Sequence, residues 1–119
     1  MSTSFQFYSI SPESIQKLEE LDYSLTGTRR LCFHKNTNSD LHMMLIDIDK
    51  NIVFPAHSHD NSDEIVILIK GEIDYLFDEH IVRLRENGAS SLIIPAAQQH
   101  KVASGPEGAR FIEVIKGPF

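Results

Sequence analysis

His57-Ser58-His59 is followed by Glu64 and Gly71, and later by His100 at the end of the run Ile94-Pro95-Ala96-Ala97-Gln98-Gln99-His100. Two histidines one residue apart project to the same side of an extended strand, because side chains alternate between its faces with a period of two. Glu64 lies at an odd offset from His59, so one unbroken strand would place it on the other face. The polar run 60–63 predicts a turn that resets the phase. With that turn, both histidines and Glu64 face inward.

Three imidazoles and one carboxylate form a ligand set for a divalent transition metal. These donors suit Zn, Fe, Mn, Ni or Cu rather than Ca or Mg, and the thiolates of a structural zinc site are lacking. We therefore predict one metal ion bound by His57, His59, Glu64 and His100. In an octahedral ion, two positions remain for water or substrate oxygens. The alternative is that these histidines are surface imidazoles near turns.

Composition excludes several classes of protein. The 119 residues, 41% of them hydrophobic, suit one domain with its own core. Eleven basic against seventeen acidic residues give a net charge of −6, which argues against nucleic-acid binding. Neither a signal peptide nor an apolar stretch of about 20 residues is present, so we expect a cytoplasmic protein without a membrane span. The single cysteine, Cys32, excludes an internal disulfide.

The secondary structure changes character after Gly27. Ser11-Pro12-Glu13 indicates a helix start, which predicts one helix at about 11–22. Beyond it, short apolar runs separated by turn residues predict an all-β sandwich or barrel. The predicted strands cover residues 29–34, 42–48, 52–57, 64–70, 73–78, 81–85, 91–95, 99–104 and 109–115. The runs 70–72 and 104–108, with Gly71 and Gly108, predict turns between strands.

The strand that begins at Glu64 is apolar on both faces. If Glu64 points inward, Val66 and Leu68 do too, and Ile65, Ile67 and Ile69 point outward. An apolar outer face needs a cover, supplied by a second sheet, the helix or another subunit. We expect a homodimer.

Two motifs carry a family resemblance. His57-x-His59-x4-Glu64-x6-Gly71 resembles the first cupin motif, and Gly88-x6-Pro95-x-Ala97-x2-His100 resembles the second, with Ala97 where the family usually has Gly. From about Arg30 to Phe119 the chain is similar to the WbuC-like family, small cupins associated with bacterial surface-polysaccharide gene clusters. Segments 30–34, 55–59 and 112–119, and Ile94-Pro95 with His100, carry that similarity; Cys32, His42, Met43 and Gln99 depart from it.

The resemblance implies a single double-stranded β-helix, a jelly-roll-like barrel at 28–119 with a metal in its mouth, preceded by an N-terminal helical extension at 1–27. Arg30, Cys32 and His34 share one strand face by the period-two rule. If that face lines the mouth, Arg30 binds a substrate carboxylate or phosphate and His34 moves protons as a candidate catalytic residue. Glu113 is a second candidate for substrate binding, unless it simply pairs with Arg30.

Other polar and aromatic residues receive structural roles. His42 and His80 are not expected to bind the metal. Tyr75 and Phe77 are more often core than substrate platform. Asp63 is a turn former that could orient a ligand histidine.

Three functions stay open at this point. The first is a metal-dependent enzyme acting on a small polar metabolite, such as a sugar or sugar nucleotide, by isomerisation, epimerisation, hydrolysis or oxygenation. The second is a non-catalytic metal-dependent module that binds or senses a small molecule. The third is an empty structural barrel, which requires the histidine cluster to be accidental.

Overall fold

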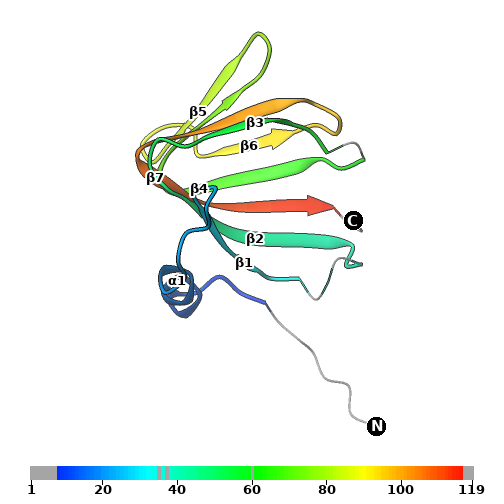
Figure 1. Cartoon of the computed structure of the whole chain (residues 1–119). Coiled ribbons are helices and arrows are strands. Elements are labelled where there is room, and N and C mark those ends of the chain that lie inside the picture. Colours follow the sequence, from blue (N-terminus) through cyan, green and yellow to red (C-terminus); the bar gives the residue numbers. More distant parts are fainter. Residues whose placement is uncertain (1–7, 35, 37, 60, 117–119) are drawn as a thin grey trace.

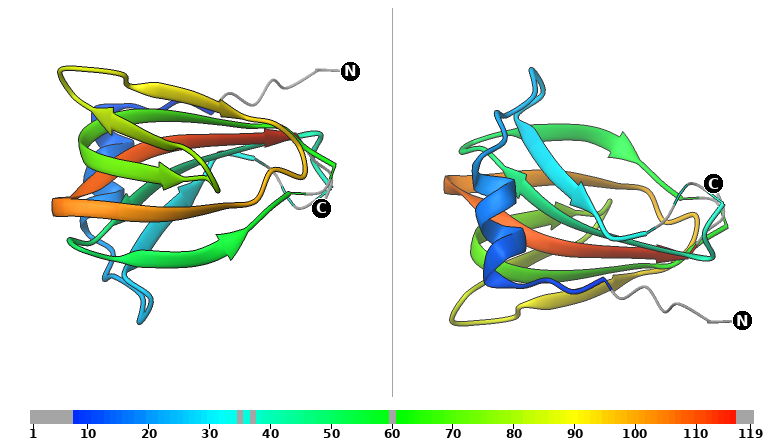
Figure 2. Two further views of the ribbon diagram at one scale, coloured as in Figure 1. Left: turned by 90° about the horizontal axis from the view of Figure 1, so that it is seen from above. Right: turned by 90° about the horizontal axis from the view of Figure 1, so that it is seen from below.

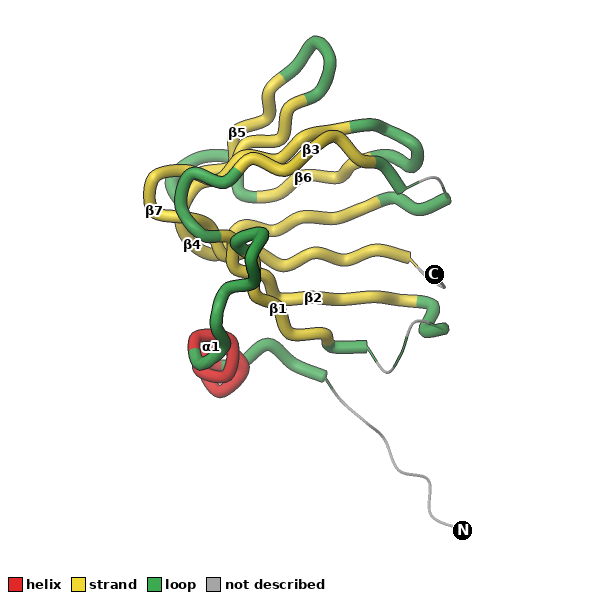
Figure 3. Tube along the Cα trace, in the orientation of Figure 1, coloured by secondary structure: helices red, strands yellow, loops and turns green. Residues whose placement is uncertain are grey.

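A computed structural model describes residues 8–34, 36, 38–59 and 61–116. Asp60 of the predicted turn and residues 117–119 of the family resemblance lie outside the described residues. The order of elements along the chain is α1 (Pro12–Glu19), β1 (Thr28–Cys32), β2 (Leu41–Ile48), β3 (Val53–His57), β4 (Glu64–Leu76), β5 (Ile81–Arg85), β6 (Ser91–Ile94) and β7 (His100–Lys116) (Figure 1). Apart from α1, the regular elements of the described residues are all strands (Figure 3), which confirms the predicted all-β architecture with one short helix.

Helix α1 begins where the sequence indicates. The Ser11 hydroxyl accepts a hydrogen bond from the Ser14 amide at 3.3 Å, and Pro12 occupies the first turn. The helix ends at Glu19, earlier than predicted. The Arg29 guanidinium accounts for this, since it donates to the carbonyls of Glu19 and Leu21 at 3.2 and 3.0 Å and satisfies the end of the helix.

The strands form two layers that share their two longest members. The first half of β7 pairs with β3, and the second half pairs with β2. The first half of β4 pairs with β6, and its second half pairs with β5. Both halves of β4 also pair with β7, so these two strands run through both layers and join them.

Glycines bend the two long strands where the sequence predicts turns. We expected turns at 70–72 and 104–108, but β4 and β7 are continuous there, with register shifts on either side of Gly71. Gly71 and Gly108 have φ of 82° and 78°. A Cβ on Gly71 would collide with the Gly108 carbonyl oxygen. The two strands can therefore approach closely at this bend because Gly71 carries no side chain.

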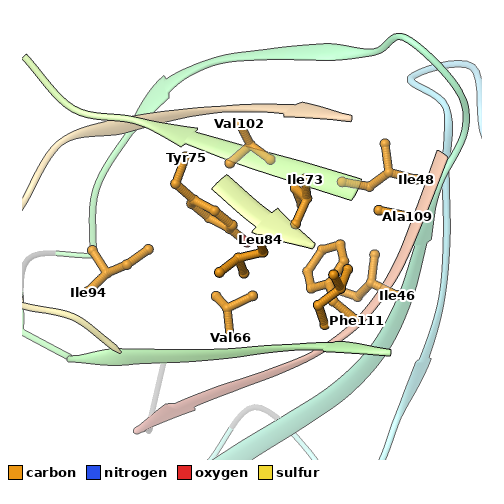
Figure 4. Close-up of a cluster of buried hydrophobic side chains, with 11 residues drawn as sticks. Ile46, Ile48, Val66, Ile73, Tyr75, Leu84, Ile94, Val102, Ala109 and Phe111 are labelled. Carbon is orange, nitrogen blue, oxygen red and sulfur yellow. The ribbon is translucent and has the colours of Figure 1, made fainter. Parts of the chain in front are cut away.

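The core lies between the layers (Figure 4). Its buried side chains come from five strands and are Ile46, Ile48, Val66, Leu68, Ile73, Tyr75, Leu84, Ile94, Val102, Ala109 and Phe111. The predicted alternation along β4 is confirmed. Val66 and Leu68 are buried, whereas Ile65, Ile67 and Ile69 are 37–40% exposed.

Helix α1 covers part of the outer face (Figure 2). It contacts β1 and β2, and Leu18 and Leu45 are both fully buried outside the main core. The buried Asp47 carboxylate holds the helix in place by accepting from Arg29 at 2.9 Å and Arg110 at 2.8 Å, while Arg110 pairs with Glu19 at 3.1 Å. Among the described residues, no helix is long and apolar enough to cross a membrane.

Candidate metal site

Three strand ends bring the predicted ligands to one end of the barrel. β3 ends at His57, β4 begins at Glu64 and β7 begins at His100. His57 and His100 are direct partners across β3 and β7, and their ring centroids lie 4.2 Å apart. The His59 ring lies 5.8 Å from that of His57. Pairing of strands distant in sequence thus assembles the three imidazoles.

Glu64 lies at the centre of this cluster. Its Oε2 atom is 3.5 Å from His100 Nε2 and 3.9 Å from His59 Nε2. Glu64 and His100 are only 3% and 2% exposed, and within the described part of the chain neither Glu64 Oε2 nor His100 Nε2 has a hydrogen-bond partner. Buried polar atoms are seldom left in this state.

The orientation of His100 explains what these two atoms need. Its Nδ1 lies 3.0 Å from the Gln98 carbonyl oxygen, which can only accept a hydrogen bond, so Nδ1 carries the hydrogen. In the neutral ring, the lone pair of Nε2 then points toward Glu64. His57 has the same arrangement, with Nδ1 3.3 Å from the Pro55 carbonyl. Backbone acceptors of this kind typically fix the tautomer of metal-binding histidines.

These residues fit a divalent transition metal. Two lone pairs facing each other in a buried site require a proton or a cation between them. Two ligands at about 2.0–2.2 Å from one ion lie roughly 3–4 Å apart, and the separations of Glu64 Oε2 from His59 and His100 fall in that range.

Glu113 joins this group from the second half of β7. Candidate ligand atoms of His59, Glu64 and Glu113 lie within 4.8 Å of one another. From the sequence, Glu113 was predicted to bind substrate. No Arg30–Glu113 ion pair is present among the described residues, and the register places Glu113 opposite Val66, beside Glu64 on the inner face.

Burial and the neighbouring acid change the protonation of the site. Burial, together with the Glu113 carboxylate, raises the pKa of Glu64 to about 9. Burial also raises the pKa of the Tyr75 hydroxyl, with smaller contributions from Glu64 and Glu113, and it lowers the pKa of His100. Without a cation, Glu64 therefore holds a proton at neutral pH.

A tight loop positions His100. The Ala97 amide donates to the His59 carbonyl at 2.7 Å, and the Ala96 amide donates to Asp63 Oδ1 at 2.8 Å. Ala97 has φ of 65°, in the left-handed region. The Asp63 carboxylate thus holds the loop that precedes His100.

A cavity of about 200 Å³ opens beside the cluster. Its lining includes His57, His59, Glu64 and Glu113, and Arg30 reaches it from β1. His34 is not among the described lining residues. Its ring instead lies 4.1 Å from that of His42, which is buried, and its Nδ1 is 3.4 Å from the Met43 carbonyl.

A family model with the description "Domain of unknown function (DUF6016)" matches residues 27–86, half of the chain. The chain belongs to the DUF6016 family. No protein of curated function matches this DUF6016 chain in sequence.

Solved structures resemble the DUF6016 chain in fold. KdgF from Halomonas sp. is 18% identical with a TM-score of 0.67, over 82% of this chain and 89% of that one. An RmlC-like cupin from Shewanella frigidimarina is 19% identical with a TM-score of 0.68, over 94% and 91%. A conserved protein of unknown function from Streptococcus pyogenes is 17% identical with a TM-score of 0.69, over 100% and 99%. The expected cupin fold is confirmed.

The sequence did not predict how two residues of the DUF6016 site lie relative to the metal ligands. Tyr75, expected in the core, is 2% exposed but also lines the cavity, with its ring 5.9 Å from that of His100. Glu113 was predicted to bind substrate, but its position beside Glu64 was not predicted. Only the pairing of β4 with β7 sets that proximity, and no local pattern encodes it. His80 is exposed.

Proposed function

We propose that this protein binds one divalent transition metal, Zn, Fe, Mn or Ni, and uses it to bind a small polar metabolite in the adjoining cavity. The observation that carries the proposal is the buried pair Glu64 Oε2 and His100 Nε2, 3.5 Å apart without hydrogen-bond partners among the described residues. A cation satisfies both atoms at once.

The proposed ligands are His57, His59, Glu64 and His100, the set predicted from the sequence. Glu113 is close enough to His59 and Glu64 to bind the same ion or to accept a hydrogen bond from a ligand on it. A bound transition metal would supply Lewis acidity, which polarises a carbonyl or hydroxyl oxygen. Arg30 would orient an anionic group at the rim of the cavity.

The metabolite class follows from two sources. The WbuC-like resemblance supports a sugar or sugar nucleotide of surface-polysaccharide metabolism in the cytoplasm. The cavity supports a small ligand, because its volume of about 200 Å³ lies below the 300–1,000 Å³ range of drug-sized sites.

A second candidate function is a non-catalytic binding or sensing module. The position of His34 favours this second function. The His34 side chain, which was predicted to move protons, packs on His42 and is absent from the described cavity lining. Turnover decides between the two functions. A metal-loaded protein that binds its metabolite without converting it is a binding module.

The proposal is tested by titrating Zn²⁺, Mn²⁺ or Ni²⁺ into chelator-treated, untagged protein in a calorimeter. We expect one ion per chain, with affinity at least tenfold lower in His59→Ala. His80→Ala is the matched control, because His80 is exposed and lies in the loop between β4 and β5. Equal binding by the wild type and His59→Ala would refute the site.

We also propose a homodimer formed through the outer face of β2, β7, β4 and β6. Met43, Val114, Ile65 and Ile93 form one row across these four strands. A second copy would cover this face, because the same apolar patch on each chain can meet its equivalent about a two-fold axis.

A further inference from the structure

The cavity beside the metal site has two kinds of wall. His57, His59, Glu64 and Glu113 form one wall. Most of the remaining lining, the apolar wall, is aliphatic or aromatic and includes Met44, Ile46, Ile48, Phe54, Val102 and Phe111. A ligand with hydroxyl groups on every side would place several of these groups against the apolar wall. Each buried hydroxyl without a hydrogen bond is unfavourable by about 1–3 kcal/mol. The cavity therefore selects a ligand with an apolar body.

Arg30 gives the cavity its net charge. Its guanidinium has no ion pair or hydrogen bond within the described ranges, unlike that of Arg29, which is occupied by Asp47 and the end of α1. A divalent ion would be balanced by the carboxylates of Glu64 and Glu113. Arg30 then remains as the uncompensated charge, which favours a ligand with one negative charge.

Arg30 and the metal site lie at opposite ends of the apolar wall. Arg30 pairs with Ile46, and Ile46 pairs with Phe111. Glu113 is the next inward residue after Phe111. Two strand spacings, about 10 Å between backbones, thus separate Arg30 from the strand that carries Glu113. A ligand between the guanidinium and the ion would lie across the side chains of Ile46 and Phe111.

The volume limits the size of this ligand. About 200 Å³ corresponds to roughly seven water molecules at about 30 Å³ each. A ligand of roughly seven to ten non-hydrogen atoms fills such a space. A sugar nucleotide is several times larger than this space, so most of it would lie outside the cavity.

We propose that the cavity takes a small monoanionic acid with an apolar body, bound between the metal ion and Arg30. The inference rests on the proposed function and names the ligand class of the same site. The carboxylate accepts from the Arg30 guanidinium, the body packs on the apolar wall, and an oxygen at the other end binds at the ion.

Calorimetry on Ni²⁺-loaded protein tests this with four probes. 4-Oxopentanoate has the expected size and charge, with its oxo group separated from its carboxylate, and its amide is the matched neutral probe; glucuronate and UDP-glucose represent sugar acids and sugar nucleotides. We expect the oxo acid to bind at least tenfold more tightly than the amide and both sugars. Arg30→Gln should lower its affinity at least tenfold with unchanged Ni²⁺ content, and Arg30→Lys should restore part of it.

Arg83→Gln is the control for the loss of one positive charge, since Arg83 lies on β5 with a side chain that is 64% exposed. It should leave binding of the oxo acid unchanged. Tighter binding of glucuronate or UDP-glucose, no binding of the oxo acid, or no effect of Arg30→Gln would overturn the ligand class while the metal site stands. Failure to bind Ni²⁺ would overturn the proposed function, and this inference with it.

Discussion

Glu64 Oε2 and His100 Nε2 face each other at 3.5 Å, on the first residues of two strands that are 36 positions apart in the sequence. Both atoms are buried, and the Gln98 carbonyl turns the lone pair of His100 toward the carboxylate. The proximity raises the electrostatic energy of the ion-free site unless a proton or a cation intervenes. Several properties of the protein should follow from this pair.

Stability of the metal-free protein should fall as pH rises from about 6.5 to about 9; below about 6.5 the lowered pKa of His100 opposes this trend. Burial and Glu113 raise the pKa of Glu64 to about 9, whereas an unfolded chain ionises near 4.5. In that window the folded state binds more protons than the unfolded one, so the free energy of unfolding falls with pH, at most by about 1.4 kcal/mol per pH unit.

Urea denaturation of chelator-treated protein across this window measures the effect. Glu64→Gln removes the titrating group, so its pH profile should be flatter than that of the wild type. Parallel profiles for the two proteins would contradict the assignment of the proton to Glu64.

Gly71→Ala should destabilise the protein by at least about 2 kcal/mol, because the added Cβ meets the Gly108 carbonyl oxygen at a residue with φ of 82°. Gly88→Ala is the control, since a Cβ there lies 3.7 Å from Arg85 Cβ, an ordinary contact. Thermal melts of the two variants should differ by several degrees. Equal melting temperatures would show that β4 and β7 do not cross as described.

Ala97→Gly should stabilise the protein by roughly 0.5–1 kcal/mol. Ala97 has φ of 65°, where a side chain costs about 1–2 kcal/mol, and the greater freedom of glycine in the unfolded chain offsets part of the gain. Ala96→Gly, one residue away, relieves no positive φ and should be neutral or destabilising. A loss of stability in Ala97→Gly, measured by urea denaturation, would argue against the described loop.

The outer apolar face gives a prediction about assembly. Ile67→Lys should convert the proposed dimer to a monomer in sedimentation velocity at micromolar concentration, because it buries a charge in an apolar interface. Ile81→Lys on β5 is the matched control, because Ile81 is 52% exposed and lies outside this face. A monomeric wild type would contradict the proposed dimer. An Ile67→Lys variant that stays dimeric would contradict the proposed interface.

The fold was largely predictable because its signals are local. Ser11 and Pro12 mark the helix start, and the alternation from Glu64 to Ile69 sets which side of β4 faces the core. Gly71 and Gly108 were also recognised from the sequence, but as residues of predicted turns. Whether a glycine reverses a strand or bends it depends on what crosses it, and that partner lies far away in the sequence.

The site was predictable only in part. The spacing of His57, His59 and Glu64 reports a shared face, which is a local property. Glu113 reaches Glu64 through the register of β4 against β7, and the side chain of His34 packs on His42 rather than in the cavity lining. Both outcomes depend on tertiary contacts, so residue spacing carries no information about them.

Metal analysis of untagged protein as isolated tests the central claim most directly. Elemental analysis by mass spectrometry should find close to one transition-metal ion per chain in the wild type, and far less in Glu64→Gln and His100→Ala, while His80→Ala keeps its metal. A folded wild type that holds no transition metal, even after incubation with Zn²⁺, Mn²⁺, Fe²⁺ and Ni²⁺, would contradict the account.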